Sequence, residues 1–178
     1  MDKVDKVTRS RIMASVGQRD TGVEMMLRSA LHRLGVRYRL HVRSLPGSPD
    51  LVFPRYRAVV FVHGCYWHAH GCHRSTFPRS NQSFWSDKFA ANQRRDAKKE
   101  AALLEAGWRV MTVWECALRG KTSRQPEEVA TAISKWLRSR ARHGRVGPPP
   151  TQLLQNTRAL LAFNRPKSAI TRPPASSD

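Results

Sequence analysis

Acidic residues are scarce in this sequence, which has 13 Asp and Glu against 32 Lys and Arg and a formal net charge of +19. This excess indicates a polyanionic partner, because basic side chains that neutralise phosphates release condensed counterions. The C-terminal segment does not account for it, since residues 145–178 contain five basic residues and one acidic residue. No basic helix with a bulky apolar face stands out as a membrane anchor. The composition therefore favours nucleic acid over an anionic membrane surface.

Long apolar runs are also missing. No stretch approaches the ~18 consecutive apolar residues of a membrane-spanning helix. The opening MDKVDKVTRSR is charged where a signal peptide would be apolar. We therefore expect a soluble cytoplasmic protein, associated with the nucleoid and with no membrane partner. Its 178 residues fit one domain with an appended tail, and we expect a monomer.

Cysteine is the third scarce residue type, with only Cys65, Cys72 and Cys116. An odd number of cysteines in a cytoplasmic protein argues against a disulfide framework. Three readings remain, namely metal binding, a reactive thiol, or buried cysteines that only fill the core.

Hydrophobic periodicity predicts an α/β fold with a central mixed β-sheet flanked by helices. Helices are expected over residues 8–17, 21–35, 86–106 and 125–144, and strands over 36–42, 51–53, 56–63 and 108–114. Thr21 and Glu24 resemble a capping box at the start of the second helix. We expect one domain over residues 1–143. Residues 144–178 should form a Pro-rich linker, a short helix and a disordered tail.

The stretch FVHGCYWHAHGC places Cys65, His70 and Cys72 within eight residues, directly after a buried strand. Cys116 follows a second strand. If the two strands are neighbours, three thiolates and one imidazole meet in the closed tetrahedral set that suits structural zinc. Spacing alone does not choose the imidazole, because His68, His70 and His73 could all reach the site.

Asp50 begins a strand in SPDLVF, and the next strand, AVVFVH, ends at His63. A Pro-Asp pair is a weak signal by itself, since a solvated turn aspartate is the commoner explanation. Four stretches change the assessment when they are taken in order, namely SLPGSPDLVF, FVHGCYWHAHGC, FWSDKFAANQRRD and GWRVMTVWECALRG. Together they closely resemble the very-short-patch-repair (Vsr) mismatch endonuclease family, over residues 5–136.

The resemblance implies a restriction-endonuclease-like sandwich with a structural zinc site. It also implies a Mg²⁺-dependent endonuclease that nicks one DNA strand 5′ to the thymine of a T·G mismatch, a lesion left when 5-methylcytosine deaminates. Two other functions stay open. One is a nuclease of the same chemistry that acts in defence against foreign DNA, and the other is a non-catalytic, zinc-stabilised DNA-binding protein. Mismatch-repair proteins are expected as partners by family analogy alone.

The family's functional residues map onto this sequence position by position. Asp50 and the main-chain carbonyl of Val62 should bind Mg²⁺, and His68 should act on the attacking water. His63 and Glu24 should support the catalytic site, although Glu24 could serve only as a helix cap. The zinc ligands implied by the resemblance are Cys65, His70, Cys72 and Cys116.

Three aromatic residues, Tyr66, Trp67 and Trp85, resemble the rings that the family inserts beside the mismatched pair. A mismatch stacks weakly, so a wedge opens that step at low cost. Packing over the zinc loop is the alternative for either tryptophan. The expected phosphate contacts are Arg9, Arg11, Arg19, Lys88, Arg94, Arg95, Lys98 and Lys99. For the five on the long helix, the alternative is a solvated basic face.

Overall fold

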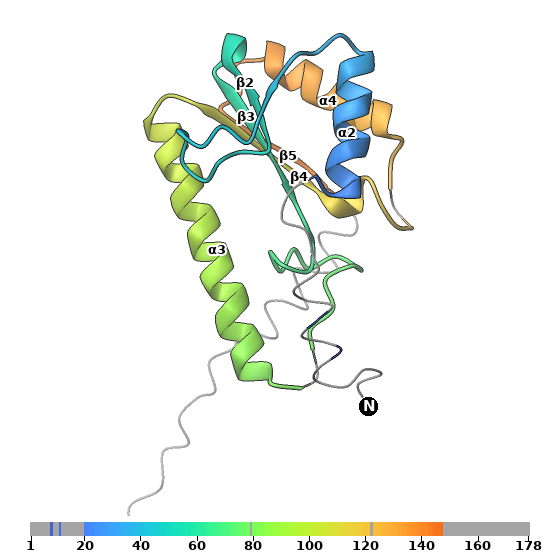
Figure 1. Cartoon of the computed structure of the whole chain (residues 1–178), viewed down its shortest axis with the longest axis vertical. Helices are drawn as coiled ribbons and strands as arrows, with labels where there is room; N and C mark the ends of the chain where they lie inside the picture. Colours follow the sequence, from blue (N-terminus) through green and yellow to red (C-terminus); the bar gives the residue numbers. More distant parts are fainter. Residues whose placement is uncertain (1–7, 9–10, 12–19, 79, 122, 148–178) are drawn as a thin grey trace, which may run out of the picture.

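The structure is a computed structural model of the chain, and it describes residues 8, 11, 20–78, 80–121 and 123–147. Five strands form one sheet in the order β1-β2-β3-β4-β5. The β1–β2 and β2–β3 pairs are antiparallel, and the β3–β4 and β4–β5 pairs are parallel. Helices α2 and α4 cover one face of this mixed sheet and α3 covers the other (Figure 1). The elements are α2 (Gly22–Arg33), β1 (Arg39–Leu40), β2 (Leu51–Phe53), the 3₁₀ turn Pro54–Tyr56, β3 (Ala58–His63), α3 (Gln82–Glu105), β4 (Arg109–Trp114), the 3₁₀ turn Glu115–Ala117, α4 (Pro126–Arg138) and β5 (His143–Val146).

Alternating side chains of the central strands enter two separate cores. In β3, Ala58 and Val60 pack beneath α2 and α4, whereas Val59 and Phe61 pack against Leu103 of α3. Successive side chains of a strand point to opposite faces. Both faces of β3 are covered, which explains its nearly continuous apolar sequence.

Helix α2 begins after the N-cap Thr21, whose side chain accepts a hydrogen bond from the Glu24 N–H at 3.3 Å. The reciprocal bond of the capping box is displaced by one residue, because the Glu24 carboxylate accepts from the N–H of Asp20 at 3.0 Å. Glu24 is only 2% exposed. The first turn of α2 therefore holds a carboxylate in the interior of the protein.

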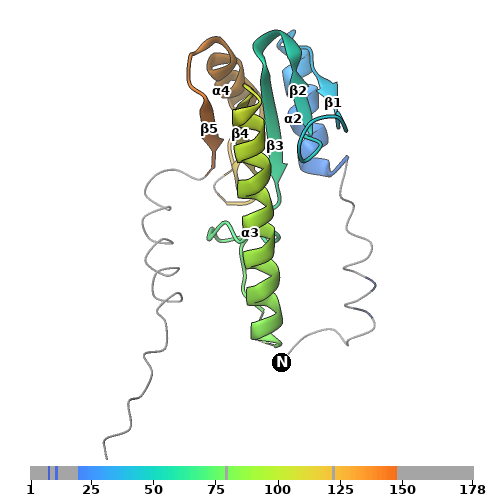
Figure 2. The ribbon, with the colours of Figure 1, turned by 90° about the vertical axis from the view of Figure 1, so that its left-hand side faces the viewer.

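Helix α3 extends well beyond the sheet, and its N-terminal half lies beside the loop of residues 64–78 (Figures 1 and 2). Near its C-terminal end, Leu103 packs on the sheet. Toward the other end, Phe89 packs against Tyr66 and Phe77, with ring centroids 5.4 and 5.8 Å apart. One helix therefore holds both the sheet and the loop that follows β3.

The predicted fold class is confirmed, since a mixed sheet is flanked by helices and carries a Cys/His cluster. Several boundaries differ, and the helix predicted over residues 125–144 ends at Arg138. The predicted strand 36–42 pairs only at Arg39 and Leu40, and α3 begins at Gln82 rather than near residue 86. The predicted helix 8–17 falls mostly outside the described residues, where only Thr8 and Arg11 are described, both helical.

Strand β5 crosses the predicted domain boundary. The predicted linker is wrong for residues 144–146, because His143–Val146 pair in parallel with β4. Only Val146 is buried in β5, so pairing with the open edge of β4 outweighs a weak local propensity. Gly144 permits the close approach, since a Cβ there would lie 2.4 Å from Met111 Cε.

The predicted short helix and disordered tail after residue 147 lie outside the described residues. Over the part of the chain that is described, no helix combines the length and apolar character needed to cross a bilayer.

Candidate active site and metal centre

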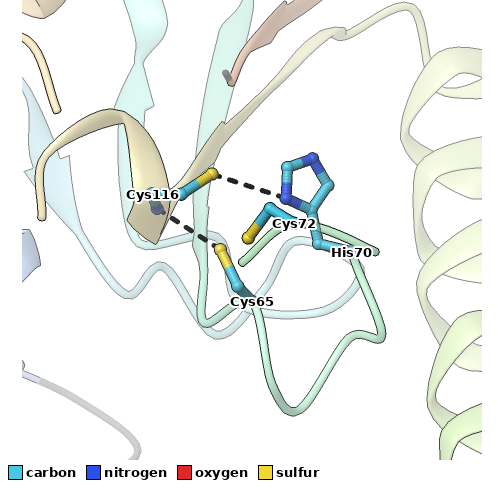
Figure 3. Close-up of side chains that lie close together, drawn as sticks. All are labelled: Cys65, His70, Cys72 and Cys116. Atoms are coloured by element: carbon cyan, nitrogen blue, oxygen red, sulfur yellow. Dashed lines mark hydrogen bonds between the residues drawn. The ribbon is translucent and has the colours of Figure 1, made fainter. Parts of the chain in front are cut away.

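Strands β3 and β4 run parallel and end together, with His63 opposite Trp114. The loop after β3 and the turn after β4 therefore meet at one edge of the sheet. There the ligand atoms of Cys65, His70, Cys72 and Cys116 all lie within 4.8 Å of one another (Figure 3). The two strands are neighbours, as expected, and their pairing brings Cys116 to the loop.

The Cys/His cluster, as we call these four residues, is enclosed. Its cysteines are buried and unpaired. His70 Nδ1 lies 3.5 Å from Cys116 Sγ, and the His70 ring stacks on Trp114 with centroids 3.9 Å apart. The backbone N–H of Cys116 donates to Cys65 Sγ at 3.3 Å. Spacing left three histidines open, and the structure places His70 in this set.

The donor chemistry of the Cys/His cluster fits zinc, which binds three sulfurs and one nitrogen in a closed tetrahedron. The hydrogen bond with Cys116 and burial raise the pKa of Cys65, and burial raises the pKa of Cys72. Thiolates are therefore costly at this position unless a cation offsets their charge. A bound cation would supply that offset and tie the loop to the end of β4.

Glu115 and Arg74 hold the loop from behind. The Cys65 N–H donates to Glu115 Oε2 at 3.3 Å, and Arg74 donates to Glu115 Oε1 at 2.7 Å. Ser75 donates to the carbonyl of Cys65 at 2.7 Å. The loop conformation is thus fixed by hydrogen bonds as well as by the cysteines.

A cavity of about 840 Å³ opens beside this loop, between the N-terminus of α2 and one face of α3. It brings together carboxylates, imidazoles and cationic side chains that are distant in the sequence. Its polar and aromatic lining residues are Thr21, His41, Ser48, Asp50, Phe61, His63, Trp67, His68, Lys88, Asn92, Arg95, Asp96, Lys99, Glu115 and Arg119.

Asp50 lies immediately before β2 and points into this cavity. Its Oδ2 accepts a hydrogen bond from the Val62 N–H at 2.7 Å. Burial raises the pKa of Asp50 to about 6, helped by the nearby Glu24 and opposed by the Val62 N–H. Among the described residues, no lysine or arginine nitrogen lies within 4.0 Å of this carboxylate. Within the described part of the chain, Asp50 is therefore a half-buried acid, 19% exposed, whose negative charge lacks a full counter-charge.

His63 and His68 stack face to face, with ring centroids 3.9 Å apart. Burial, reinforced by the neighbouring His68, lowers the pKa of His63 to about 3, so its imidazole is neutral near pH 7. His68 Nδ1 hydrogen-bonds the carboxylate of Asp96 on α3. Burial tends to raise the pKa of Asp96, but the bond to His68 and the charges around it outweigh burial and hold that pKa low. His68 is thereby oriented by an ionised carboxylate.

Sequence reasoning missed Asp96, Asn92, His41 and Arg119. Asn92 donates to the carbonyl of Trp67 at 2.7 Å, so α3 holds the loop at two places. Positions 88, 92, 96 and 99 recur at helical spacing, so they share one face of α3. This spacing was the sequence signal that could have predicted Asn92 and Asp96 beside Lys88. His41 and Arg119 sit in irregular segments that carry no such signal.

Glu24 lies near Asp50, and the imidazole of His41 lies between the two carboxylates. His41 Nε2 is 3.2 Å from Glu24 Oε1, and His41 Nδ1 is 3.8 Å from Asp50 Oδ1. Arg28 contacts both Glu24 and Asp20 on the far side. Glu24 thus combines the predicted capping contact with a contact to His41, which lines the cavity.

Aromatic rings gather where the loop meets the start of α3. Tyr66 and Trp67 are half-buried, whereas Trp85 is 8% exposed and supports them at centroid distances of 5.7 and 6.5 Å. The ammonium of Lys88 lies 5.8 Å from the Trp67 ring centroid. The three rings predicted to intercalate therefore form one cluster, and Trp67 lines the cavity.

The predicted phosphate contacts of α3 fall on two faces. Lys88, Arg95 and Lys99 line the cavity, whereas Arg94 and Lys98 are exposed and do not. Among the predicted N-terminal contacts, Arg11 is exposed, and Arg9 and Arg19 lie outside the described residues.

The fold and these two sites define an α/β protein with a Cys/His cluster whose donors fit zinc and a basic cavity that combines acids and imidazoles suited to phosphodiester chemistry. The family described as DNA mismatch endonuclease Vsr matches residues 1–74. The type II nicking enzyme V.XorIIP of Xanthomonas oryzae pv. oryzae is 49% identical over 117 residues, 66% of this chain and 86% of that protein. The DNA mismatch endonuclease Vsr of Escherichia coli is 42% identical over 136 residues, 76% of this chain and 87% of that protein. The chain belongs to the Vsr family of DNA-nicking endonucleases, and its substrate is DNA.

Proposed function

We propose that the protein is a Mg²⁺-dependent endonuclease that nicks one strand 5′ to the thymine of a T·G mismatch, in the repair of deaminated 5-methylcytosine. The observation that carries the proposal is the convergence of Asp50 with the His68–Asp96 pair in one cavity lined by cationic side chains. The E. coli relative is named a DNA mismatch endonuclease. The Cys/His cluster is proposed to hold a structural zinc ion.

Asp50 and the Val62 carbonyl are proposed to hold the catalytic cation. Asp50 fits this role, because burial raises its pKa and a cation bound beside the carboxylate would stabilise the ionised form. Mg²⁺ accepts one or two protein oxygens and completes its shell with water and phosphate oxygens. When bound, it would neutralise charge on the attacking and leaving oxygens of the phosphodiester.

His68 is proposed to take the proton from the attacking water. Its Nδ1 is bonded to Asp96, which fixes the tautomer and leaves Nε2 as the basic nitrogen. His63, neutral and stacked on His68, keeps the ring plane in place. Lys88, Arg95 and Lys99 are proposed to contact the DNA phosphates that flank the cut.

Mismatch selectivity is assigned to the rings. Tyr66 and Trp67, supported by Trp85, are proposed to enter the duplex at the weakly stacked T·G step. Each base that stacks on a ring returns about 1–3 kcal/mol, while a matched step costs more to open. Discrimination between T·G and matched duplex then depends on the free energy needed to open the base-pair step.

Cleavage-site mapping on short duplexes tests the proposal. The zinc-loaded protein should nick a T·G duplex in Mg²⁺, 5′ to the thymine, and leave the matched duplex intact. Asp50→Ala should bind the T·G duplex and not nick it. Equal nicking of matched and T·G duplexes would favour a nuclease acting on foreign DNA. If the wild type binds the T·G duplex and does not nick it, the result would favour a non-catalytic DNA-binding protein.

A further inference from the structure

His41 occupies a position between two carboxylates that no function assigned above explains. It follows β1, lines the cavity, and has a backbone φ of +45°. Its side chain is 14% exposed, with Nε2 lying 3.2 Å from Glu24 Oε1 and Nδ1 lying 3.8 Å from Asp50 Oδ1. Nε2 is buried, and its contact with Glu24 lacks the alignment of a hydrogen bond. The ring thus lies between the two acids, and its buried Nε2 has no hydrogen-bond partner among the described residues.

Glu24 is fixed independently of His41. Its Oε2 accepts from the Asp20 N–H at 3.0 Å, and its Oε1 lies 3.4 Å from the Arg28 guanidinium. A buried, immobilised carboxylate beside one imidazole nitrogen directs the other nitrogen's lone pair away from it. In metal-binding histidines a carboxylate commonly accepts a hydrogen bond from one nitrogen while the other nitrogen binds the cation, and Glu24 Oε1 lies 3.2 Å from His41 Nε2, within the distance of such a bond.

We propose that His41 Nδ1 is an additional ligand of the divalent cation held by Asp50. This inference rests on the proposed function for the presence of that cation. Asp20, Glu24 and His41 also lie within 4.8 Å of one another. On that side, however, Arg28 already contacts both carboxylates. The Asp50 side has no such guanidinium among the described residues, so the cation belongs between His41 and Asp50.

An imidazole nitrogen changes which metals the site prefers. Oxygen donors suit Mg²⁺, whereas an imidazole nitrogen adds affinity for first-row transition metals, least for Mn²⁺ and more for Co²⁺ and Ni²⁺. The site of this chain should therefore bind Mn²⁺ more tightly than an all-oxygen site would. His41 should account for a large part of that preference.

Electron paramagnetic resonance with Mn²⁺ tests the assignment. The full zinc-loaded chain is titrated with Mn²⁺ in the presence of a pre-nicked duplex, which carries the product phosphate. Electron spin-echo modulation then reports nitrogen bonded to Mn²⁺. His41→Asn is the main variant, because asparagine tolerates a positive φ and is too short to reach the cation. His32→Gln, at an exposed position of α2, is the matched control.

Wild type and His32→Gln should show nitrogen coupling, and His41→Asn should lose it and bind Mn²⁺ at least about tenfold more weakly. His41→Gln should show the same loss if the asparagine variant does not fold. Absence of Mn²⁺ uptake or of nitrogen coupling in the wild type, or unchanged coupling in the variants, overturns the proposal. If coupling is lost as expected but the wild type does not nick T·G duplexes, the ligand assignment stands and the proposed function fails.

Discussion

The loop of residues 64–78 sends side chains into two environments of opposite character. Toward the end of β4 it contributes Cys65, His70 and Cys72 to an enclosed set of soft ligands. Toward α3 it presents Trp67 and His68 to an open cavity of hard oxygen donors and cations. The enclosed side is arranged to stabilise the fold, and the open side holds groups in states that cost stability. Sites that perform chemistry are commonly found where electrostatics are unfavourable.

Asp50→Asn should give the sharpest contrast between the two sides. Loss of the proposed cation ligand should reduce nicking by about a thousandfold, since metal stabilisation of the transition state is worth several kcal/mol. Without added Mg²⁺, the same variant should be more stable than the wild type at pH 7. Nicking rates and thermal melting over a pH series measure the two effects.

The sign of the stability effect follows from linkage. The pKa of Asp50 is about 6 in the folded protein, against 3.8 for an unperturbed aspartate. The carboxyl group therefore favours folding only when protonated, fully below about pH 4, and this contribution is lost as pH rises through about 6. Asparagine should recover about 2–3 kcal/mol at pH 7. A variant that melts lower than the wild type at pH 7 would contradict the view that this side costs stability.

Cys116→Ser should have the opposite effect on stability. If zinc is present at a thousand times its dissociation constant, loss of binding removes about 4 kcal/mol, or roughly 10 °C in Tm for a chain of this size. Metal analysis should find one zinc in the wild type and none in the variant. If Cys116→Ser melts like the parent, the Cys/His cluster is not a structural metal site.

How far the sequence could predict these two sides depends on where each signal lies. The apolar periodicity of α2 and the continuous apolar run of β3 indicate which side chains are buried, so both elements could be predicted from their own residues. Strand β5 could not, because only Val146 is buried and its pairing with β4 decides its structure. To predict the Cys/His cluster, only the approach of two strand ends was needed, but spacing did not choose His70 over His68.

The open side was less predictable, because its contacts are made between elements distant in the sequence. Asp96 reaches His68 across 28 positions, and His41 reaches Glu24 through a chain reversal between α2 and β1. A single aspartate on a basic helix looks like an ordinary solvated residue. Only the placement of α3 against the loop shows its partner.

Asp96→Asn tests whether α3 supports the reaction through His68. Loss of the charged acceptor should reduce nicking about a hundredfold, the usual contribution of an oriented base, with little change in zinc content or DNA affinity. Asp87→Asn, an exposed position of the same helix, is the control. The double variant with His68→Gln should lose hardly more than His68→Gln alone, because the two residues act as a unit. Additive losses would separate Asp96 from the reaction.

Trp67→Ala should affect recognition and leave the enclosed side intact. Loss of one stacked base, about 1–3 kcal/mol, should lower the preference for T·G over matched duplex by about tenfold or more. Phe84→Ala is the matched comparison, since Phe84 belongs to the same ring cluster, is 55% exposed and does not line the cavity. Equal loss of preference in both variants would assign the wedge to the cluster as a whole.

The smallest expected effect concerns two neighbouring lysines on α3 that point in different directions. Lys99→Ala and Lys98→Ala compare their contributions to DNA binding. Lys99 lines the cavity and lies 3.9 Å from Asp96, whereas Lys98 is exposed on another face. Removing one phosphate contact should lower the slope of log K against log salt by about 1. We expect that change for Lys99→Ala and a smaller one for Lys98→Ala, from binding titrations over a salt series. If both slopes fall equally, the DNA follows the whole basic surface of α3, and the cavity does not define its path.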